Sequence, residues 1–207
     1  MIKLYGPKRS NAGRCHVLAK EIGLEYEAVP VNLPKGEHNS PEYLKLNPNG
    51  KVPCLVDGDF VLWESVAINN YLASKHKPEL LGNSSEERAL IDQWSYWGSL
   101  DVQPLFHRIS FQKFRIPEDQ RDEKAIQDAM NALPRVLKIL DEHLSEREYM
   151  LGDKFTLADI NLGIALLVAR QAEYDLSEYA NISRWMETLL ERPSFKEGLE
   201  TTKKIDL

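Results

Sequence analysis

A hydroxyl group stands where the chain passes from its first apolar run into a helical pattern, in the segment 10–14, SNAGR. Near the start of a helix, the first backbone N–H groups have no partner within the helix, and the helix dipole favours negative charge. Such a position can bind an anion. Ser10 is therefore a candidate for stabilising an anionic group of a ligand.

Two further segments carry groups suited to binding a peptide. The segment 49–53, NGKVP, enters an apolar run, and a cis bond before Pro53 would turn the peptide of Val52 outward to pair with an extended ligand. Glu64 and Ser65 open a helical pattern, where free N–H groups and the serine hydroxyl can hold a carboxylate, and Glu64 can hold an ammonium group. Together with Ser10, these groups describe a pocket for a small peptide that bears a carboxylate, an ammonium group and a thiol.

The elements that must position these groups alternate between strand and helix. The pattern predicts strands at 2–5 and 26–31, a helix between them that ends at Gly23, a hairpin at 52–63, and a helix that Ser65 caps and that runs towards Lys75. This order is the thioredoxin-like arrangement. Its first crossover should be right-handed, so that the first two strands are parallel.

The rest of the chain is helical nearly throughout. A long stretch at 86–114 contains Pro104, which should kink or break it. An apolar stripe at steps of three and four, from Ile126 to Leu144, predicts another long helix, and Thr156 and Asp159 form a capping-box pattern before a further one. We expect an α/β domain followed by an all-α domain: residues 1–80, thioredoxin-like, and residues 87–207, a helical bundle.

Composition excludes several classes of protein. Of 207 residues, 43% are hydrophobic and 28% charged, as in ordinary globular proteins, and a net charge of −6 argues against nucleic-acid binding. No run approaches the roughly 18 apolar residues of a membrane helix, and the sequence opens without a signal segment. Cys15 and Cys54 have neither Cys-x-x-Cys nor metal-ligand spacing. We expect a cytoplasmic protein without metal, membrane or nucleic-acid partners.

Several motifs, in their order and spacing, resemble the soluble glutathione transferases over nearly the whole chain. They are S-x-x-x-R at 10–14, GEH at 36–38, NPNGKVP at 47–53, DGD at 57–59, WES-x-AI-x-x-YL at 63–72 and GD-x-FTLAD at 152–159. The serine after the first strand is similar to that of the theta and phi branches of the family. The tyrosine branches use a tyrosine instead.

The resemblance implies a role for each residue of the first site. Ser10 matches the hydroxyl that donates to the glutathione sulfur, and Asn11 beside it can share or replace that role. The other positions match groups that bind the rest of glutathione: Val52 and cis-Pro53 for the cysteinyl portion, Glu64 and Ser65 for the γ-glutamyl portion, and His38 and Lys51 for the glycine carboxylate.

The resemblance also implies an activity and partners. Glutathione is the expected co-substrate, activated as thiolate to attack a small hydrophobic electrophile, with glutathione peroxidase or dehalogenase activity left open. The expected lining of the electrophile pocket is Trp97, Phe106 and Phe111, and a homodimer is expected. The alternative is a non-catalytic interaction module, as in translation-factor subunits and bacterial regulatory proteins. The motif QW-x-x-W at 93–97 is similar to the translation-associated relatives.

Overall fold

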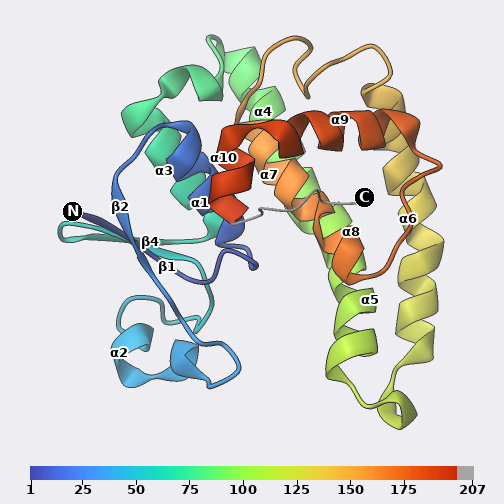
Figure 1. The fold of residues 1–207 in the computed structure, drawn as a ribbon, viewed down its shortest axis with the longest axis horizontal. Coiled ribbons are helices and arrows are strands. Elements are labelled where there is room, and N and C mark those ends of the chain that lie inside the picture. The colour runs from blue at the N-terminus through green and yellow to red at the C-terminus, as the bar shows by residue number, and fades with distance from the viewer. Residues whose placement is uncertain (200–207) are drawn as a thin grey trace. The chain divides into compact units, whose positions relative to one another are not determined.

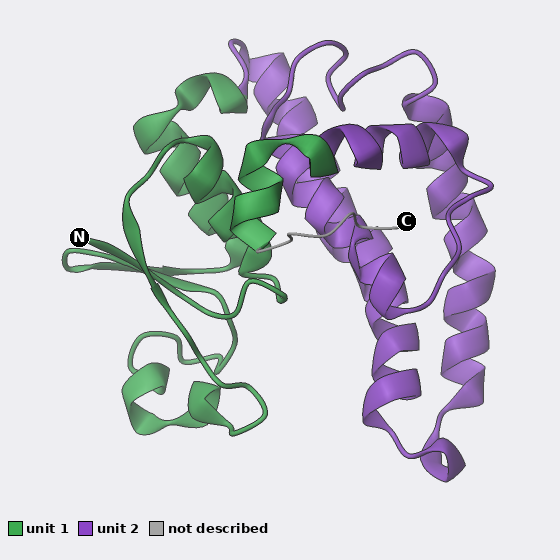
Figure 2. Cartoon of the chain, in the orientation of Figure 1, with its two compact units in different colours: residues 1–81, 190–204 green, residues 82–189, 205–207 purple. Residues whose placement is uncertain are grey.

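The computed structural model describes residues 1–199, and the contacts within the chain divide it into two compact units (Figure 2). Unit 1 contains residues 1–81 and the segment that begins at Leu190, and unit 2 contains residues 82–189. The chain therefore returns to unit 1 after completing unit 2. The sequence had assigned this last segment to the helical domain.

Unit 1 is built on a four-stranded sheet in the order β2-β1-β3-β4 (Figure 1). The strands are β1 (Ile2–Tyr5), β2 (Tyr26–Val29), β3 (Cys54–Asp57) and β4 (Phe60–Trp63). β1 and β2 are parallel, whereas β3 is antiparallel to β1 and to β4. The crossover between the parallel strands contains α1 (Gly13–Glu21), since parallel strands cannot be joined by a tight turn. The predicted thioredoxin-like arrangement is confirmed.

Helices cover both sides of this sheet. In Figure 1, α1, α3 (Ser65–His76) and α10 (Pro193–Leu199) lie on one side, and the short α2 (Pro41–Leu44) lies on the other. Short 3-10 turns precede α2 (η1, Glu37–Asn39) and follow α3 (η2, Pro78–Leu81). The layers bury the apolar faces of the strands.

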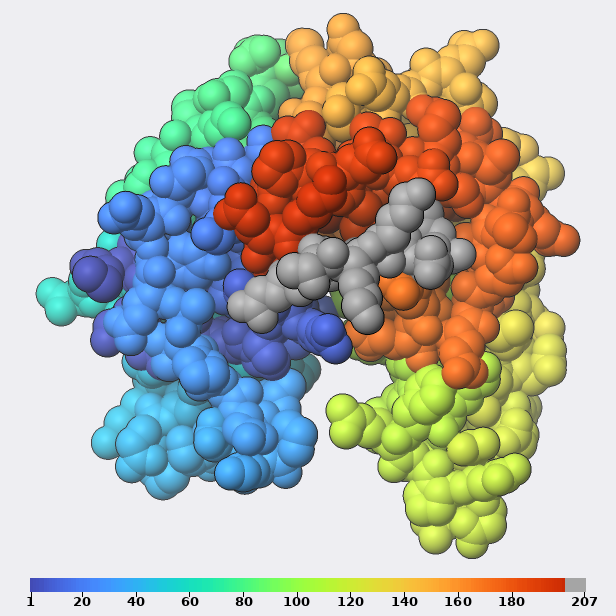
Figure 3. Space-filling view, in the orientation of Figure 1, coloured from blue at the N-terminus to red at the C-terminus, as the bar shows by residue number. Residues whose placement is uncertain are grey.

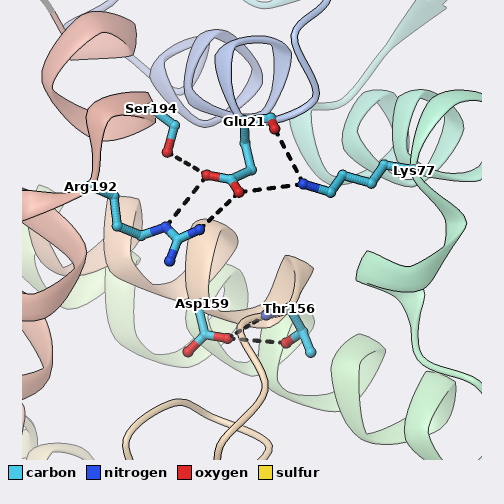
Figure 4. Close-up of polar contacts among 6 residues, drawn as sticks. All are labelled: Glu21, Lys77, Thr156, Asp159, Arg192 and Ser194. Carbon is cyan, nitrogen blue, oxygen red and sulfur yellow. Dashed lines mark hydrogen bonds and ion pairs between the residues drawn. The ribbon is translucent and has the colours of Figure 1, made fainter.

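The helix α10 is fixed to α1 by polar contacts (Figure 4) and by close packing. The Glu21 carboxylate accepts hydrogen bonds from Arg192 Nη2 at 2.8 Å and from Ser194 Oγ at 2.6 Å. A Cβ atom added to Gly198 would lie 2.7 Å from the Cα atom of Val17, so that only glycine permits this approach. The C-terminal helix is therefore a structural part of unit 1.

Unit 2 is helical, as predicted. Its helices are α4 (Ser85–Trp97), α5 (Gln103–Arg115), α6 (Glu123–His143), α7 (Leu157–Leu166), α8 (Val168–Gln171) and most of α9 (Ala180–Glu191), with a 3-10 turn, η4, at Glu118–Gln120. None of the helices within residues 1–199 is both long and apolar enough to cross a membrane.

The break predicted at Pro104 has a different form in the structure. The chain passes from α4 to α5 through a π-helical turn, Gly98–Val102, and Pro104 is the second residue of α5. A proline lacks the N–H group that an interior helical position needs, and it is tolerated at the start of a helix. Gly98 also lies against α7, where an added Cβ would come within 2.6 Å of Leu162 Cδ1.

The predicted capping box of α7 is present and is buried. The Asp159 carboxylate accepts hydrogen bonds from Thr156 N at 2.9 Å, Met150 N at 2.8 Å and Trp185 Nε1 at 3.0 Å. Burial raises the pKa of Asp159 to about 6, although these donors favour its charged form. One carboxylate therefore joins three segments of unit 2.

Candidate functional site

The Ser10 turn connects β1 to α1 and is held closely against that helix. The Ser10 hydroxyl donates to the Pro7 carbonyl at 2.6 Å and accepts from the Ala12 N–H at 3.1 Å. At Gly13, an added Cβ would lie 2.5 Å from the Lys8 carbonyl oxygen. To donate to a ligand, the Ser10 hydroxyl must therefore turn its hydrogen away from Pro7.

A buried histidine anchors the beginning of this turn. His16, only 1% exposed, places Nε2 3.1 Å from the Gly6 carbonyl oxygen and Nδ1 2.9 Å from the Tyr26 hydroxyl. Since a carbonyl only accepts, Nε2 carries the hydrogen, and in the neutral ring Nδ1 accepts from Tyr26. Sequence reasoning missed His16, because its partners are known only from the tertiary structure.

The Ser10 turn and the Val52 segment meet at Gly6. This glycine has a φ of 127°, and an added Cβ would lie 2.9 Å from the Cβ atoms of both Ala12 and Val52. A side chain at residue 6 would force the two segments apart. The peptide bond between Val52 and Pro53 is cis, as expected from the sequence.

The Val52 segment is fixed through the residue before it. The Lys51 carbonyl accepts from the Tyr43 hydroxyl at 2.6 Å and from Asn47 Nδ2 at 2.7 Å. The backbone N–H and C=O of Val52 itself form no hydrogen bond with any residue among 1–199. The segment therefore presents backbone hydrogen-bonding groups without a partner in that part of the chain. Tyr43 and Asn47 are two further positioning residues that the sequence did not reveal.

The His38 segment lies beside Lys51. At Gly50, an added Cβ would be 2.9 Å from Asn39 Oδ1 and 3.3 Å from the His38 carbonyl oxygen. The His38 ring places Nε2 3.2 Å from Asn39 Nδ2. His38 and Lys51, which are 13 positions apart in the chain, are thus brought to the same part of unit 1.

The start of α3 combines a strained residue with free N–H groups. Glu64 has a φ of 73°, unusual for a residue other than glycine, and α3 begins at Ser65. The first N–H bonded to the Glu64 carbonyl is that of Ile68, which leaves the three preceding N–H groups outside the helical pattern. The predicted capping role of Ser65 is wrong, because Glu64 precedes the helix and Ser65 is its first residue.

A buried charge and a buried thiol lie between α1 and α3. Burial lowers the pKa of Arg14 to about 10, with the charge of Glu64 opposing the shift, so that Arg14 is a cation at neutral pH. The Cys15 thiol contacts the Ser65 carbonyl at 3.5 Å. Burial raises the pKa of Cys15 to about 12 and that of Cys54 to about 11. Both thiols are protonated near neutral pH, which argues against a cysteine nucleophile.

The three aromatic candidates of unit 2 differ in exposure. Phe106 has no exposed surface and packs against Tyr174, with ring centres 5.6 Å apart, so its ring belongs to the core of unit 2. Trp97 is half-buried beside Trp94, and Phe111 is 54% exposed. Trp97 and Phe111 therefore offer ring surface to a ligand, whereas Phe106 does not. No group of three or more metal-ligating side chains is found among residues 1–199.

Two family models match the chain. Residues 1–74 match the N-terminal domain of glutathione S-transferase, and residues 102–193 match its C-terminal domain. A probable glutathione S-transferase GSTF2 from Oryza sativa subsp. japonica is 37% identical over 203 residues, and glutathione S-transferase 1 from Zea mays is 38% identical over 199 residues. Each alignment covers 93% of this chain and 93% of the relative.

Solved structures agree with these matches. A theta class glutathione S-transferase from the citrus canker pathogen Xanthomonas axonopodis pv. citri, with glutathione bound, has a TM-score of 0.87 at 33% identity, covering 97% of this chain and 98% of that one. Glutathione S-transferase-I bound with lactoylglutathione has a TM-score of 0.84 at 37% identity, covering 96% and 98%. This chain, with matches to both domains and to relatives along nearly its whole length, belongs to the glutathione S-transferase family.

Proposed function

We propose that this chain is a glutathione transferase, in which unit 1 binds glutathione and holds its sulfur as a thiolate beside Ser10. The observation that carries the proposal is the meeting of the Ser10 turn and the Val52 segment at Gly6. The first segment offers a hydroxyl, and the second offers backbone groups that can pair with a peptide. Membership of the family favours this catalytic function over the alternative of an interaction module.

Each portion of glutathione has a matching group in this proposal. The backbone of Val52 pairs with the cysteinyl portion, as one extended chain pairs with another. The N–H groups at the start of α3 and the Ser65 hydroxyl take the γ-glutamyl carboxylate, and Glu64 takes its ammonium group. We assign His38 and Lys51 to the glycine carboxylate, because their segments lie side by side in unit 1.

Activation of the thiol needs more than one hydrogen bond. A free thiol has a pKa near 8.5, and lowering it by two units requires about 3 kcal/mol of preferential binding of the thiolate. A charge-assisted hydrogen bond contributes roughly 1.5–3 kcal/mol, and Ser10 must first give up its bond to Pro7. The start of α1 and the buried Arg14 cation would therefore have to add to this stabilisation of the thiolate, with Asn11 as an alternative donor.

The thiolate then acts as a nucleophile. Its electron pair forms a bond from sulfur to an electrophilic carbon, and a leaving group departs with the electrons of the bond that breaks. In an addition to an activated double bond, those electrons move onto the substrate, which takes a proton from water. We assign Trp97 and Phe111 to the binding of the hydrophobic electrophile, because their rings are accessible in unit 2.

We also propose that the protein is a homodimer of the cytoplasm. The edge strand β4 exposes Phe60, Val61 and Trp63 by 46%, 38% and 38%. Apolar edge strands are normally covered, and a second copy of the chain would cover this one. The two cysteines are free and buried, which suits a reducing compartment.

The test is an ultraviolet difference titration of bound glutathione with the wild type and Ser10→Ala. A thiolate signal well below the free-thiol pKa in the wild type, and lost in the variant, is the expected result. A depressed pKa that Ser10→Ala leaves unchanged, but Asn11→Ala raises, would transfer the role to Asn11. Absence of glutathione binding would overturn the proposal.

A further inference from the structure

Unit 1 contains a pocket that none of the predicted glutathione contacts lines. Its volume is about 330 Å³, and it is lined by residues at the end of β2 and in and around α2. The segment that contains α2 is light blue in Figure 3. Apolar walls come from Val29, Val31 and Leu46. A cavity of this size, within unit 1 alone, accommodates a small organic molecule.

Two tyrosine rings form the aromatic part of the wall. Tyr5 and Tyr43 pack edge to face, with ring centres 6.2 Å apart. The Tyr43 hydroxyl donates a hydrogen bond to the Lys51 carbonyl. The Tyr5 hydroxyl, in contrast, has no hydrogen bond with any residue from 1 to 199, and Tyr5 is one of the residues that line the pocket.

The charged groups of the pocket are both acidic. Glu37 and Glu42 line it, and no lysine, arginine or histidine among residues 1–199 does. One carboxylate oxygen of Glu37 accepts from the Asn32 N–H at 2.6 Å. The exposed Glu42 carboxylate makes neither an ion pair nor a hydrogen bond with any of the described residues. An uncompensated carboxylate next to aromatic rings favours a cation and disfavours an anion.

We propose that this pocket is a second ligand site, which binds a small organic cation. The ammonium group lies beside Glu42 and Glu37 and near the Tyr5 hydroxyl, and an aromatic or branched apolar body packs on Tyr43 and the aliphatic wall. Glutathione does not fit this chemistry, because it carries two carboxylates and only one ammonium group. The pocket is therefore distinct from the proposed thiolate site, although Tyr43 lines the pocket and also donates to the Lys51 carbonyl beside that site.

The proposal is tested with the full chain and 2-phenylethylammonium chloride as the probe, in a ligand-observed NMR titration with and without saturating glutathione. Glu42→Gln removes the unpaired carboxylate, and Glu25→Gln is the matched control, because Glu25 is also exposed and without a partner among residues 1–199. 2-Phenylethanol serves as the neutral analogue of the probe. Tyr5→Phe tests the hydroxyl separately.

We expect the ammonium probe to bind saturably to the wild type. Its affinity should fall about tenfold in Glu42→Gln, and 2-phenylethanol should bind the wild type about tenfold more weakly than the probe does. Glu25→Gln and saturating glutathione should leave the affinity for the probe unchanged. Tyr5→Phe should weaken binding of the ammonium probe but not of 2-phenylethanol. Equal affinity in wild type and Glu42→Gln would overturn the proposal, as would binding that never saturates. Displacement of the probe by glutathione would assign it to the thiolate site instead.

Discussion

In the proposed site, the negative charge of Glu64 distinguishes an ammonium group from a neutral one. Glu64→Gln keeps the size of the side chain and removes the charge, so we expect the KM for glutathione to rise about tenfold with kcat little changed. Steady-state kinetics over a range of glutathione concentrations measures both constants. Glu27→Gln, an exposed residue of β2, is the control. A lower kcat at unchanged KM would contradict a binding role.

Asp159 gives unit 2 a defined dependence on pH. Its pKa is raised from 3.8 to about 6 in the fold, so the folded state holds this proton more tightly than the unfolded state. The contribution of Asp159 to the free energy of unfolding is therefore most favourable below about pH 4 and declines as the pH rises through 6. Two pKa units correspond to about 3 kcal/mol.

This dependence is measured as a difference between two proteins. We expect urea unfolding to show the wild type losing about 2.5 kcal/mol relative to Asp159→Asn between pH 4 and pH 7. The variant also loses hydrogen-bond acceptors, which shifts its stability by a constant amount and does not alter the comparison. Parallel pH curves for the two proteins would show that Asp159 has no raised pKa.

At the scale of elements, the Glu21 carboxylate strengthens the attachment of α10 to α1. The Glu21 side chain is 11% exposed and accepts from Arg192 and Ser194, so Glu21→Gln should lower the free energy of unfolding by about 2 kcal/mol. The pair of Lys3 and Glu27, 43% and 48% exposed, is the control. Glu27→Gln should change stability by less than about 1 kcal/mol. Equal losses in urea unfolding would contradict the attachment.

Elements with local signals could be predicted from the sequence. Two apolar runs and the turn at residues 57–59 were enough to predict the hairpin. Thr156 and Asp159, three residues apart, were enough to predict the capping box. The π turn before α5 and the return of α10 to α1 could not be predicted. Both depend on neighbours distant in the chain, since Gly98 lies against Leu162, and Gly198 against Val17.

The residues of the candidate site likewise fall into those that the sequence predicts and those that it does not. Ser10, the Val52–Pro53 bond and Glu64 belong to local motifs, and the sequence named them. The anchors behind them, His16 and Tyr43, have no local signature, because each acts through a carbonyl group of another segment. Burial of Phe106 likewise depends on Tyr174, which lies 68 positions further along the chain.

At the scale of the whole molecule, the apolar edge of β4 predicts the assembly. We expect the wild type to sediment with twice the 23.7 kDa mass of one chain, and Phe60→Glu to sediment as a single chain, because a charge on this edge opposes its burial. Ile139→Glu, at a 41% exposed position of α6, is the control. A wild type that sediments as a single chain would contradict the homodimer.

The return of α10 has a consequence for biosynthesis. Translation proceeds from the N-terminus, so the surface of α1 that α10 covers remains bare on the ribosome until nearly all of the helical unit has been made. The first unit to emerge is thus among the last to be completed. A gene truncated after residue 81 would encode the whole sheet but not the helix that covers α1, and its product would display the uncovered surface of α1 to chaperones and proteases.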